Sequence, residues 1–381
     1  MSKPKICIIT ATPLTIHFFF REHLKLMAQW ADVTVVFNKK LNAGIDVSDL
    51  PITIKHIHIM RKISLFWDVL SLVSLIRLFS LQNYDMVMSL TPKAGLLSML
   101  AAKLASIGVR LHIFQGEVWA SKTGIMRVLL KAADKATARL ATNIMAVSRS
   151  QRLFLETNRI AAKECIKVLG EGSISGVDIN KFKLNLRARK CERLKHQIPD
   201  DALVALFLGR ITRDKGVFEL LAAFSVVARE INDFWLVLAG PDEEGLTDIL
   251  YSSVDSDLHD RILFTGFQLA PENLISAADF LCLLSFREGF GLCALEAATC
   301  GVPALGTDIP GLRDAIINNK TGVLVPLNDP QLTVCAMREL ALNTTFRLEL
   351  GAAGKARARA NFDAKSVVKA YDREFCNLID G

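Results

Sequence analysis

"DFLCLLSFREGFGLCALEAATCGVPALGT", residues 279–307, sets the fold of the second half of this chain. The runs at 279–285 and 302–307 are almost continuously apolar, which is typical of strands covered on both faces of a sheet. Between them, residues 292–300 predict a helix that ends at Gly301, and a proline follows soon after as a stop signal. The stretch therefore predicts a strand, a helix and a second, parallel strand.

Similar strand-like runs, interspersed with helical patterns, form two series along the chain. They occupy residues 5–10, 32–37, 85–90, 109–114 and 143–148, and then 202–209, 234–240, 261–266, 279–285, 302–307 and 322–326. This alternation predicts an α/β protein with two doubly wound, Rossmann-like domains facing each other across a deep cleft. We assign residues 1–180 to the first domain, with a C-terminal helix at 364–381 packing back onto it, and residues 181–363 to the second. The polar, basic segment 171–201 is interpreted as the linker.

Composition limits the class of protein. With 381 residues, 51% hydrophobic and 22% charged, the chain suits two globular domains and not a disordered protein. The eight cysteines include no CxxC pair and no zinc-ligand spacing, so we interpret them as reduced core thiols of a cytosolic protein. The start of the chain has too short an apolar run for a signal peptide, so no secretion is expected. The net charge of +7 favours an anionic partner.

The most apolar stretch, residues 63–81, is nearly as long as a membrane span, but Asp68 and Arg77 interrupt it. We interpret it as a buried or interfacial helix, with a true span as the less favoured alternative.

Cations gather where the first strand of the second series ends. Arg210, Arg213 and Lys215 precede a predicted helix that begins near Val217, although a helix N-terminus is itself partly positive. A solvated loop is the simple explanation. The alternative is that an anion such as a diphosphate binds between the loop and the helix N-terminus.

The loop before the helix at 292–300 is a second place where an anion could bind at a helix N-terminus. Gly289 and Gly291 allow the backbone to approach a ligand and to direct N–H groups at it. Glu288 then lies ahead of the helix and Glu296 within its second turn. A nucleotide sugar would bring its phosphates to the amides and its ribose and sugar hydroxyls to the two carboxylates, whereas a capping or solvated acid is the alternative for Glu296.

"GRITRDKG" (209–216), followed by "REGFGLCALEAATCGVPALGTDIPGLRDAI" (287–316), resembles the donor domain of the family 4 retaining glycosyltransferases, which have the GT-B fold. The segments "TPKAGLLSMLAAKLA", "FQGEVW", "MAVSRSQ" and "GSISGVD" extend the similarity over nearly the whole chain. The resemblance is greatest to the branch that builds bacterial surface polysaccharides on lipid carriers.

The resemblance implies a role for each matching residue. Arg210 and Lys215 would hold the donor diphosphate and assist the leaving group, Glu288 would contact the transferred sugar, and Glu296 would bind the ribose. The backbone of Gly289, Phe290, Gly291 and Leu292 would touch phosphate or sugar, and Gly240 and Gly266 would border the base. No metal or other cofactor is expected, and "DSD" at 255–257 is not interpreted as a metal site because it precedes a strand.

The acceptor half departs from the family pattern. Its first loop, "TATPLT" (10–15), lacks the glycines of many relatives, and Gln115 stands where relatives often have a histidine. His112 lies within a predicted strand, where a hydrogen-bonded core histidine is the favoured interpretation. If an acceptor-side group is needed, the candidates are His17, Gln115 and Glu117. A front-face mechanism, in which the leaving phosphate oxygen receives the acceptor proton, needs none of them.

A cationic stripe suggests how the chain reaches its acceptor. Residues 124–140 predict a helix with cations every four residues and with Val128 and Leu129 on the opposite side. A solvated face is the default interpretation, and a surface for anionic lipid is the alternative. The stripe, with a preceding lysine, comprises Lys122, Arg127, Lys131, Lys135 and Arg139. Phe18 to Phe20, beside further cations, suit the same interface.

The resemblance, together with these features, implies a retaining, metal-independent glycosyltransferase at the cytoplasmic face of the membrane, associated peripherally. It would move a hexose or N-acetylhexosamine from a UDP-sugar to a polyprenyl-diphosphate-linked saccharide. The alternatives are a nucleotide-sugar epimerase of the same fold and a non-catalytic nucleotide-binding membrane adaptor. No nucleic-acid partner is expected, because the basic residues lack interleaved aromatic residues for base stacking.

Overall fold

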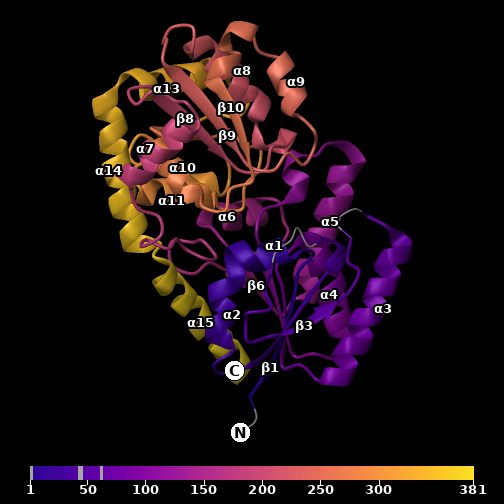
Figure 1. Ribbon diagram of the computed structural model, residues 1–381. Coiled ribbons are helices and arrows are strands. Elements are labelled where there is room, and N and C mark those ends of the chain that lie inside the picture. The colour runs from indigo at the N-terminus through magenta and orange to yellow at the C-terminus, as the bar shows by residue number, and fades with distance from the viewer. Residues whose placement is uncertain (1–2, 42–45, 61–62) are drawn as a thin grey trace. The chain divides into compact units, whose positions relative to one another are not determined.

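The computed structural model describes residues 3–41, 46–60 and 63–381 (Figure 1). The chain folds into two compact units. Unit 1 comprises Met1–Gly176 and Lys365–Gly381, and unit 2 comprises Val177–Ala364. Unit 2 thus begins four residues before the predicted boundary at 181 and ends one residue after the predicted end at 363.

Unit 1 is built on a parallel sheet with the strand order β3-β2-β1-β4-β5-β6-β7. Its strands are β1 (Lys5–Ile9), β2 (Asp32–Phe37), β3 (Thr53–His56), β4 (Met86–Ser89), β5 (Val109–Phe114), β6 (Asn143–Ala146) and β7 (Ile166–Lys167). The central strands are buried, as their continuous apolar runs predict. The sequence did not reveal the edge strands β3 and β7, because β3 is mostly exposed and polar and β7 has only two residues.

Helices connect these strands. The longer ones in unit 1 are α2 (Arg21–Met27), α3 (Leu65–Gln82), α4 (Pro92–Leu104), α5 (Gly124–Leu140), α6 (Arg149–Thr157) and α15 (Ala364–Asp380). Short helical turns are α1 (Pro13–Thr15), η1 (Ile16–Phe20), η2 (Lys39–Leu41), η3 (Val118–Ser121) and η4 (Lys163–Cys165). The C-terminal helix α15 packs on α2, where Tyr371 and Phe375 contact His23. Its Asp372 also accepts a hydrogen bond from Trp30 at 2.8 Å.

Unit 2 has a second parallel sheet, with the order β10-β9-β8-β11-β12-β13. Its strands are β8 (Leu203–Leu208), β9 (Phe234–Ala239), β10 (Ile262–Gly266), β11 (Phe280–Leu283), β12 (Ala304–Thr307) and β13 (Gly322–Val325). Each corresponds to a predicted apolar run. The helices and turns are α7 (Leu186–Lys195), η5 (Arg213–Lys215), α8 (Val217–Val227), α9 (Thr247–Ser252), η6 (Ser256–Arg261), α10 (Pro271–Ala277), α11 (Leu292–Thr299), α12 (Leu312–Ala315), α13 (Pro330–Leu342) and α14 (Thr344–Asn361).

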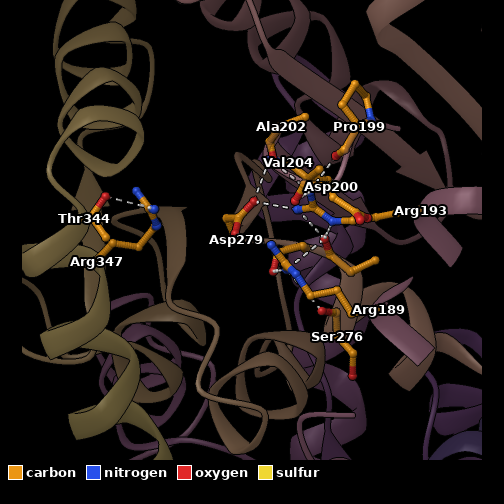
Figure 2. A network of polar contacts seen from close by, with 12 residues as sticks. Arg189, Arg193, Pro199, Asp200, Ala202, Val204, Ser276, Asp279, Thr344 and Arg347 are labelled. Atoms are coloured by element: carbon orange, nitrogen blue, oxygen red, sulfur yellow. Dashed lines mark hydrogen bonds and ion pairs between the residues drawn. The ribbon is translucent and has the colours of Figure 1, made fainter. Parts of the chain in front are cut away.

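The interpretation of residues 171–201 as a linker is wrong for most of the segment, because residues 177–201 belong to unit 2 and include α7, which packs against α10. Figure 2 shows how the buried guanidinium of Arg193 fixes this helix. Arg193 donates hydrogen bonds to the carbonyl oxygens of Ala277 and Ala202 and to the carboxylate of Asp279, at 2.7 to 3.1 Å. Basic residues that suggest a solvated linker therefore satisfy carbonyl groups inside unit 2.

Candidate functional site

Loops at the carboxyl ends of the unit 2 strands form the candidate site. In a parallel sheet these ends share one edge, so the loops after β8 and β11 lie together there, and the amide of Phe286 donates to the carbonyl oxygen of Asp214 at 2.9 Å. Gly216, with φ 68°, allows the first loop to approach, because a Cβ there would overlap the carbonyl of Leu284.

Lys215 and Glu288, both predicted site residues, form an ion pair at the centre of this edge. The ammonium Nζ of Lys215 lies 2.6 Å from Oε1 of Glu288, and both side chains are largely buried. The hydroxyl of Ser285 donates to the same carboxylate oxygen at 2.8 Å, and Thr307 in turn donates to the carbonyl of Ser285. The Glu288 carboxylate is therefore held in one orientation by β11 and β12 together.

Asp214 gathers cations beside this pair. Its carboxylate lies 2.8 Å from Arg287 and accepts a hydrogen bond from Thr212 at 2.6 Å. Burial alone raises the pKa of Asp214, but the Thr212 hydrogen bond and the charges of Arg287, Lys215 and Arg210 lower it below its ordinary value. Asp214 therefore stays ionised and positions the cations around it.

Arg210 extends the positive charge toward the loop after β9. Its guanidinium is ion-paired with Glu243 at 2.7 Å, with both side chains about one-third exposed. In the same loop, Glu244 lies 4.0 Å from Arg213. Glu243 and Glu244 thus neutralise cations that a diphosphate would contact, so a bound diphosphate would compete with these two carboxylates.

The helices α8 and α11 contribute their N-termini to the same edge. In the described structure neither helix has a side-chain N-cap, and the first turn of α11 holds no acidic residue. The N-cap of α11 is Gly291, with φ 77°. Such N-termini present backbone N–H groups and a partial positive charge, which favour phosphate oxygens. Of the other predicted backbone contacts, Gly240 donates to the carbonyl of Gly266 at 2.8 Å, and Phe290 packs in the core against Phe362.

Glu296 lies in the second turn of α11, as predicted, and is only partly exposed. Burial raises the pKa of its carboxyl to about 7; the charge of Lys181 offsets part of this effect and that of Glu272 adds to it. Lys181 is also ion-paired with Glu272 at 3.6 Å. A carboxyl group that titrates near neutral pH in this position suits a ligand that supplies hydrogen-bond donors, such as the hydroxyls of a ribose.

Several side chains at this edge were missing from the sequence prediction. They are Lys181, Asp214, Glu243, Glu272, Ser285, Arg287 and Thr307. The run "PDEEG" directly after β9 could have suggested Glu243, because it places acids at the edge where Arg210 lies. The proximity of Lys181 to Glu272 depends on residues about ninety positions apart, and no local pattern reveals it.

The acceptor-side candidates lie in unit 1, where each is described within that unit. Glu117 is buried and accepts a hydrogen bond from Gln151 at 2.8 Å. Gln115 directly follows β5, and its Nε2 is buried without a hydrogen-bond partner among the described residues. His17 lies in η1. His112 is a core histidine, as predicted: it is buried in β5, and its Nδ1 lies 2.7 Å from the hydroxyl of Ser89.

The orientation predicted for α5 is wrong. Val128 and Leu129, expected on the buried side, are exposed. Arg127 and Lys131 instead lie over the ring of Trp119, at 5.4 and 5.3 Å from its centroid. Four residues advance a helix by slightly more than one turn, so the stripe winds outward from these two cations through the half-buried Lys135 to the exposed Arg139, and Lys122 is exposed before the helix.

The predicted aromatic cluster is also only partly correct. Phe20 is buried and stacks on His23, whereas Phe18 is exposed. Burial lowers the pKa of His23 to about 4, against the effects of the Ile174 carbonyl and Glu22. Phe20 and His23 therefore belong to the core of unit 1.

Two observations concern the rest of the described structure. Among the described residues, no group of three or more His, Cys, Asp or Glu side chains is placed to hold a metal ion, and Asp255 of the "DSD" run pairs with Arg229. A shallow groove of about 540 Å³ in unit 1 is lined by Lys135, Arg139, Glu156 and neighbours. It follows the C-terminal ends of α5 and α6, opposite the carboxyl edge of the sheet.

Two units, each built on a parallel sheet whose strands are connected by helices, have the architecture of the GT-B fold. Residues 189–357 match the family model described as "Glycosyl transferases group 1". The chain is 28% identical, over 81% of its length and 80% of the relative's, to the capsular polysaccharide biosynthesis glycosyltransferase CapM of Staphylococcus aureus. Residues 189–357, which include the sheet of unit 2, are thus similar to the group 1 glycosyltransferases.

Two further comparisons concern a second relative and a solved structure. The chain is 28% identical to the UDP-Gal:alpha-D-GlcNAc-diphosphoundecaprenol alpha-1,3-galactosyltransferase of Escherichia coli, over 71% of this chain and 69% of that protein. The crystal structure of Anabaena HepE in complex with UDP and glucose superposes with a TM-score of 0.81 at 17% identity, covering 98% of this chain and all of that one. At 17% identity, the likeness to HepE shows a shared fold alone.

Proposed function

We propose that this glycosyltransferase moves a hexose or N-acetylhexosamine from a UDP-sugar to a polyprenyl-diphosphate-linked saccharide, with retention of the anomeric configuration, in the synthesis of a surface polysaccharide. The observation that carries the proposal is the edge of unit 2, where Arg210, Lys215 and the N-termini of α8 and α11 provide positive charge for a diphosphate. The S. aureus and E. coli relatives support the polysaccharide context, and the name of the latter supports a UDP donor and a lipid-linked acceptor.

In the proposed reaction the bond between the anomeric carbon and the β-phosphate oxygen breaks, and the acceptor hydroxyl oxygen bonds to that carbon. The acceptor proton passes to the departing phosphate oxygen on the same face. Lys215 and Arg210 offset the negative charge that develops on the leaving diphosphate, which is the largest electrostatic demand of the step. Glu288, fixed by Lys215 and Ser285, would hold sugar hydroxyls.

Two roles follow for the remaining residues. Glu296 would bind the ribose, and Gly240 and Gly266 would border the base. We propose that no metal is required, because cationic side chains and helix N-termini supply the positive charge that the diphosphate needs.

The experiment is an assay of the purified protein with a panel of UDP-sugars, with and without a short polyprenyl-diphosphate-linked saccharide. Release of UDP that depends on the acceptor, with an α-linked product from an α-linked donor, is the expected result. Formation of an epimer without acceptor would identify an isomerase. Binding of donors without any turnover would identify an adaptor, and either result would overturn the proposal.

A further inference from the structure

The outer face of α3 is unusually apolar for a surface helix. Only Ser71, Leu75 and Phe79 of its 18 residues are buried, and α4 is its main packing partner. Large apolar side chains cover the other side, with exposed fractions from 41% for Trp67 to 81% for Leu65. These exposed residues are Leu65, Phe66, Trp67, Val69, Leu70, Val73 and Leu81. Exposed apolar surface of this extent marks an interaction site.

By length and composition α3 is the one described helix that could cross a membrane, but its contacts tie it to unit 1. Asp68, in its first turn, is ion-paired with Lys93 of α4 at 2.5 Å. Ser71 donates to the carbonyl of His58 at 3.0 Å, and Leu75 and Phe79 belong to the core cluster shared with α4. A helix fixed to its own domain in this way does not cross a bilayer; it can only contact the bilayer surface with its exposed face.

A second apolar patch lies on α5. Ile125, Met126, Val128 and Leu129 are exposed in its first two turns, and α5 also packs against α4. Both helices lead into the next strand of a parallel sheet, α3 into β4 and α5 into β6, so both begin at its carboxyl edge. We call the exposed apolar residues of α3 and of the first two turns of α5 the apolar rim.

The charge around the apolar rim is positive. Residues 63–82 and 118–133 contain one acid, Asp68, which Lys93 neutralises. The same residues contain four cations, of which Arg77 and Lys122 are exposed. The remaining two are Arg127 and Lys131. A second copy of this chain would bring the same positive charge to the rim, whereas a bilayer with anionic headgroups offers both apolar depth and negative charge.

We propose that the apolar rim of unit 1 binds the surface of an anionic lipid bilayer, with Phe66, Val69 and Val73 inserted among the lipids and Trp67 at the level of the headgroups. This inference rests on the proposed function for its purpose, since a polyprenyl-linked acceptor is presented at a bilayer surface, but not for the binding itself. The first turns of α3 and α5, which carry part of the rim, begin at the carboxyl edge of the unit 1 sheet, where Gln115 and Glu117 also lie, so the bilayer would present acceptors near that edge.

The experiment compares vesicles of phosphatidylcholine mixed with phosphatidylglycerol against phosphatidylcholine alone, in sedimentation assays with the whole chain. Val69→Glu/Val73→Glu should bind the anionic vesicles at least tenfold more weakly than the unchanged protein. The matched control is Leu342→Glu/Leu348→Glu in unit 2, where the two leucines are 62% and 63% exposed; it should bind like the unchanged protein. Thermal unfolding and UDP titration of each variant verify that the fold and the donor site are intact.

A second measurement locates the contact. Lipids brominated near the headgroup should quench part of the tryptophan fluorescence, and Trp67→Phe should remove most of that quenching. Of the other three tryptophans, Trp119 is buried, Trp30 is hydrogen-bonded to Asp372 of α15, and Trp235 lies in β9 of unit 2. Equal vesicle binding by the Val69/Val73 variant and its control would overturn the proposal. So would equal binding to neutral and anionic vesicles, or a dimer that the same substitutions dissociate while vesicles are ignored. Vesicle binding through the rim by a protein that transfers no sugar would instead refute the proposed function alone.

Discussion

The ammonium of Lys215 and the carboxylate of Glu288 lie 2.6 Å apart, and this pair joins the loop after β8 to the loop after β11. A diphosphate bound beside Lys215 would share its ammonium with Glu288, so the proposed function predicts that donor binding and orientation of the sugar are coupled through this one contact. Removing either partner leaves the other charge largely buried and unpaired.

Lys215→Ala is expected to lower kcat for a UDP-sugar by about 100-fold and to weaken UDP binding, because the proposed mechanism assigns to this ammonium the charge of the leaving diphosphate. Steady-state kinetics and calorimetric titration measure the two effects. The matched control is Arg229→Ala, a surface cation paired with Asp255, which should leave both unchanged. Near-native kcat in Lys215→Ala would contradict the role of this lysine.

Glu288→Gln should separate the two effects. The amide keeps the shape but loses the charge, so kcat is expected to fall about tenfold or more, while the affinity for UDP, which lacks the sugar, stays within about threefold. A variant that lost UDP affinity as severely as Lys215→Ala would show that Glu288 serves the nucleotide and not the sugar.

Affinity for a UDP-sugar should depend on pH through Glu296, whose pKa of about 7 is raised by burial. The ionised carboxylate accepts both ribose hydroxyls better than the protonated form. Binding is therefore expected to strengthen by up to about tenfold from about pH 6 to about pH 8, and Glu296→Gln should flatten this profile. Because the folded protein holds this proton more tightly than the unfolded chain, the stability of unit 2 without donor should fall as the pH rises from about 4.5 to about 7 and then level off. A profile unchanged by the substitution would assign the titration to another group.

Gly216→Ala should disrupt the candidate site at the carboxyl edge of the unit 2 sheet. A Cβ at Gly216 would overlap the carbonyl of Leu284, whereas Gly245 has a similar φ of 66° with no atom within 4 Å of such a Cβ. Gly245→Ala should therefore cost only the backbone strain, about 1 kcal/mol, and Gly216→Ala distinctly more, with loss of UDP binding. Urea unfolding and UDP titration of both variants measure the difference, and equal effects would contradict the close approach.

Arg193→Met tests the clamp that holds α7. The buried guanidinium satisfies several carbonyl groups and Asp279, so its removal should lower the free energy of unfolding of unit 2 by about 3–5 kcal/mol. Arg229→Met, at an exposed pair, should change it by less than about 1 kcal/mol. A small effect in both variants would mean that α7 is not fixed by this residue.

Features that depend on consecutive residues could be predicted from the sequence, whereas contacts between distant residues could not. The central strands were predictable because burial on both faces requires apolar runs, and α11 because Gly301 ends it. The edge strand β3 carries no such run. The orientation of α5, meaning which of its faces is exposed, was mispredicted because Arg127 and Lys131 pack on Trp119. A cationic stripe at helical spacing does not reveal this contact. Glu288 and Lys215 could be assigned to one edge, but the carboxylates of Glu243 and Asp214 that hold the cations depend on how the loops meet.

The central claim is that the edge of unit 2 binds the diphosphate of a nucleotide, and a crystal structure of the protein with UDP tests it most directly. We expect the diphosphate within hydrogen-bonding distance of Arg210, Lys215 and the first amides of α11, with Glu243 displaced from Arg210. UDP bound at another location, with the Arg210–Glu243 and Lys215–Glu288 pairs undisturbed, would contradict the account.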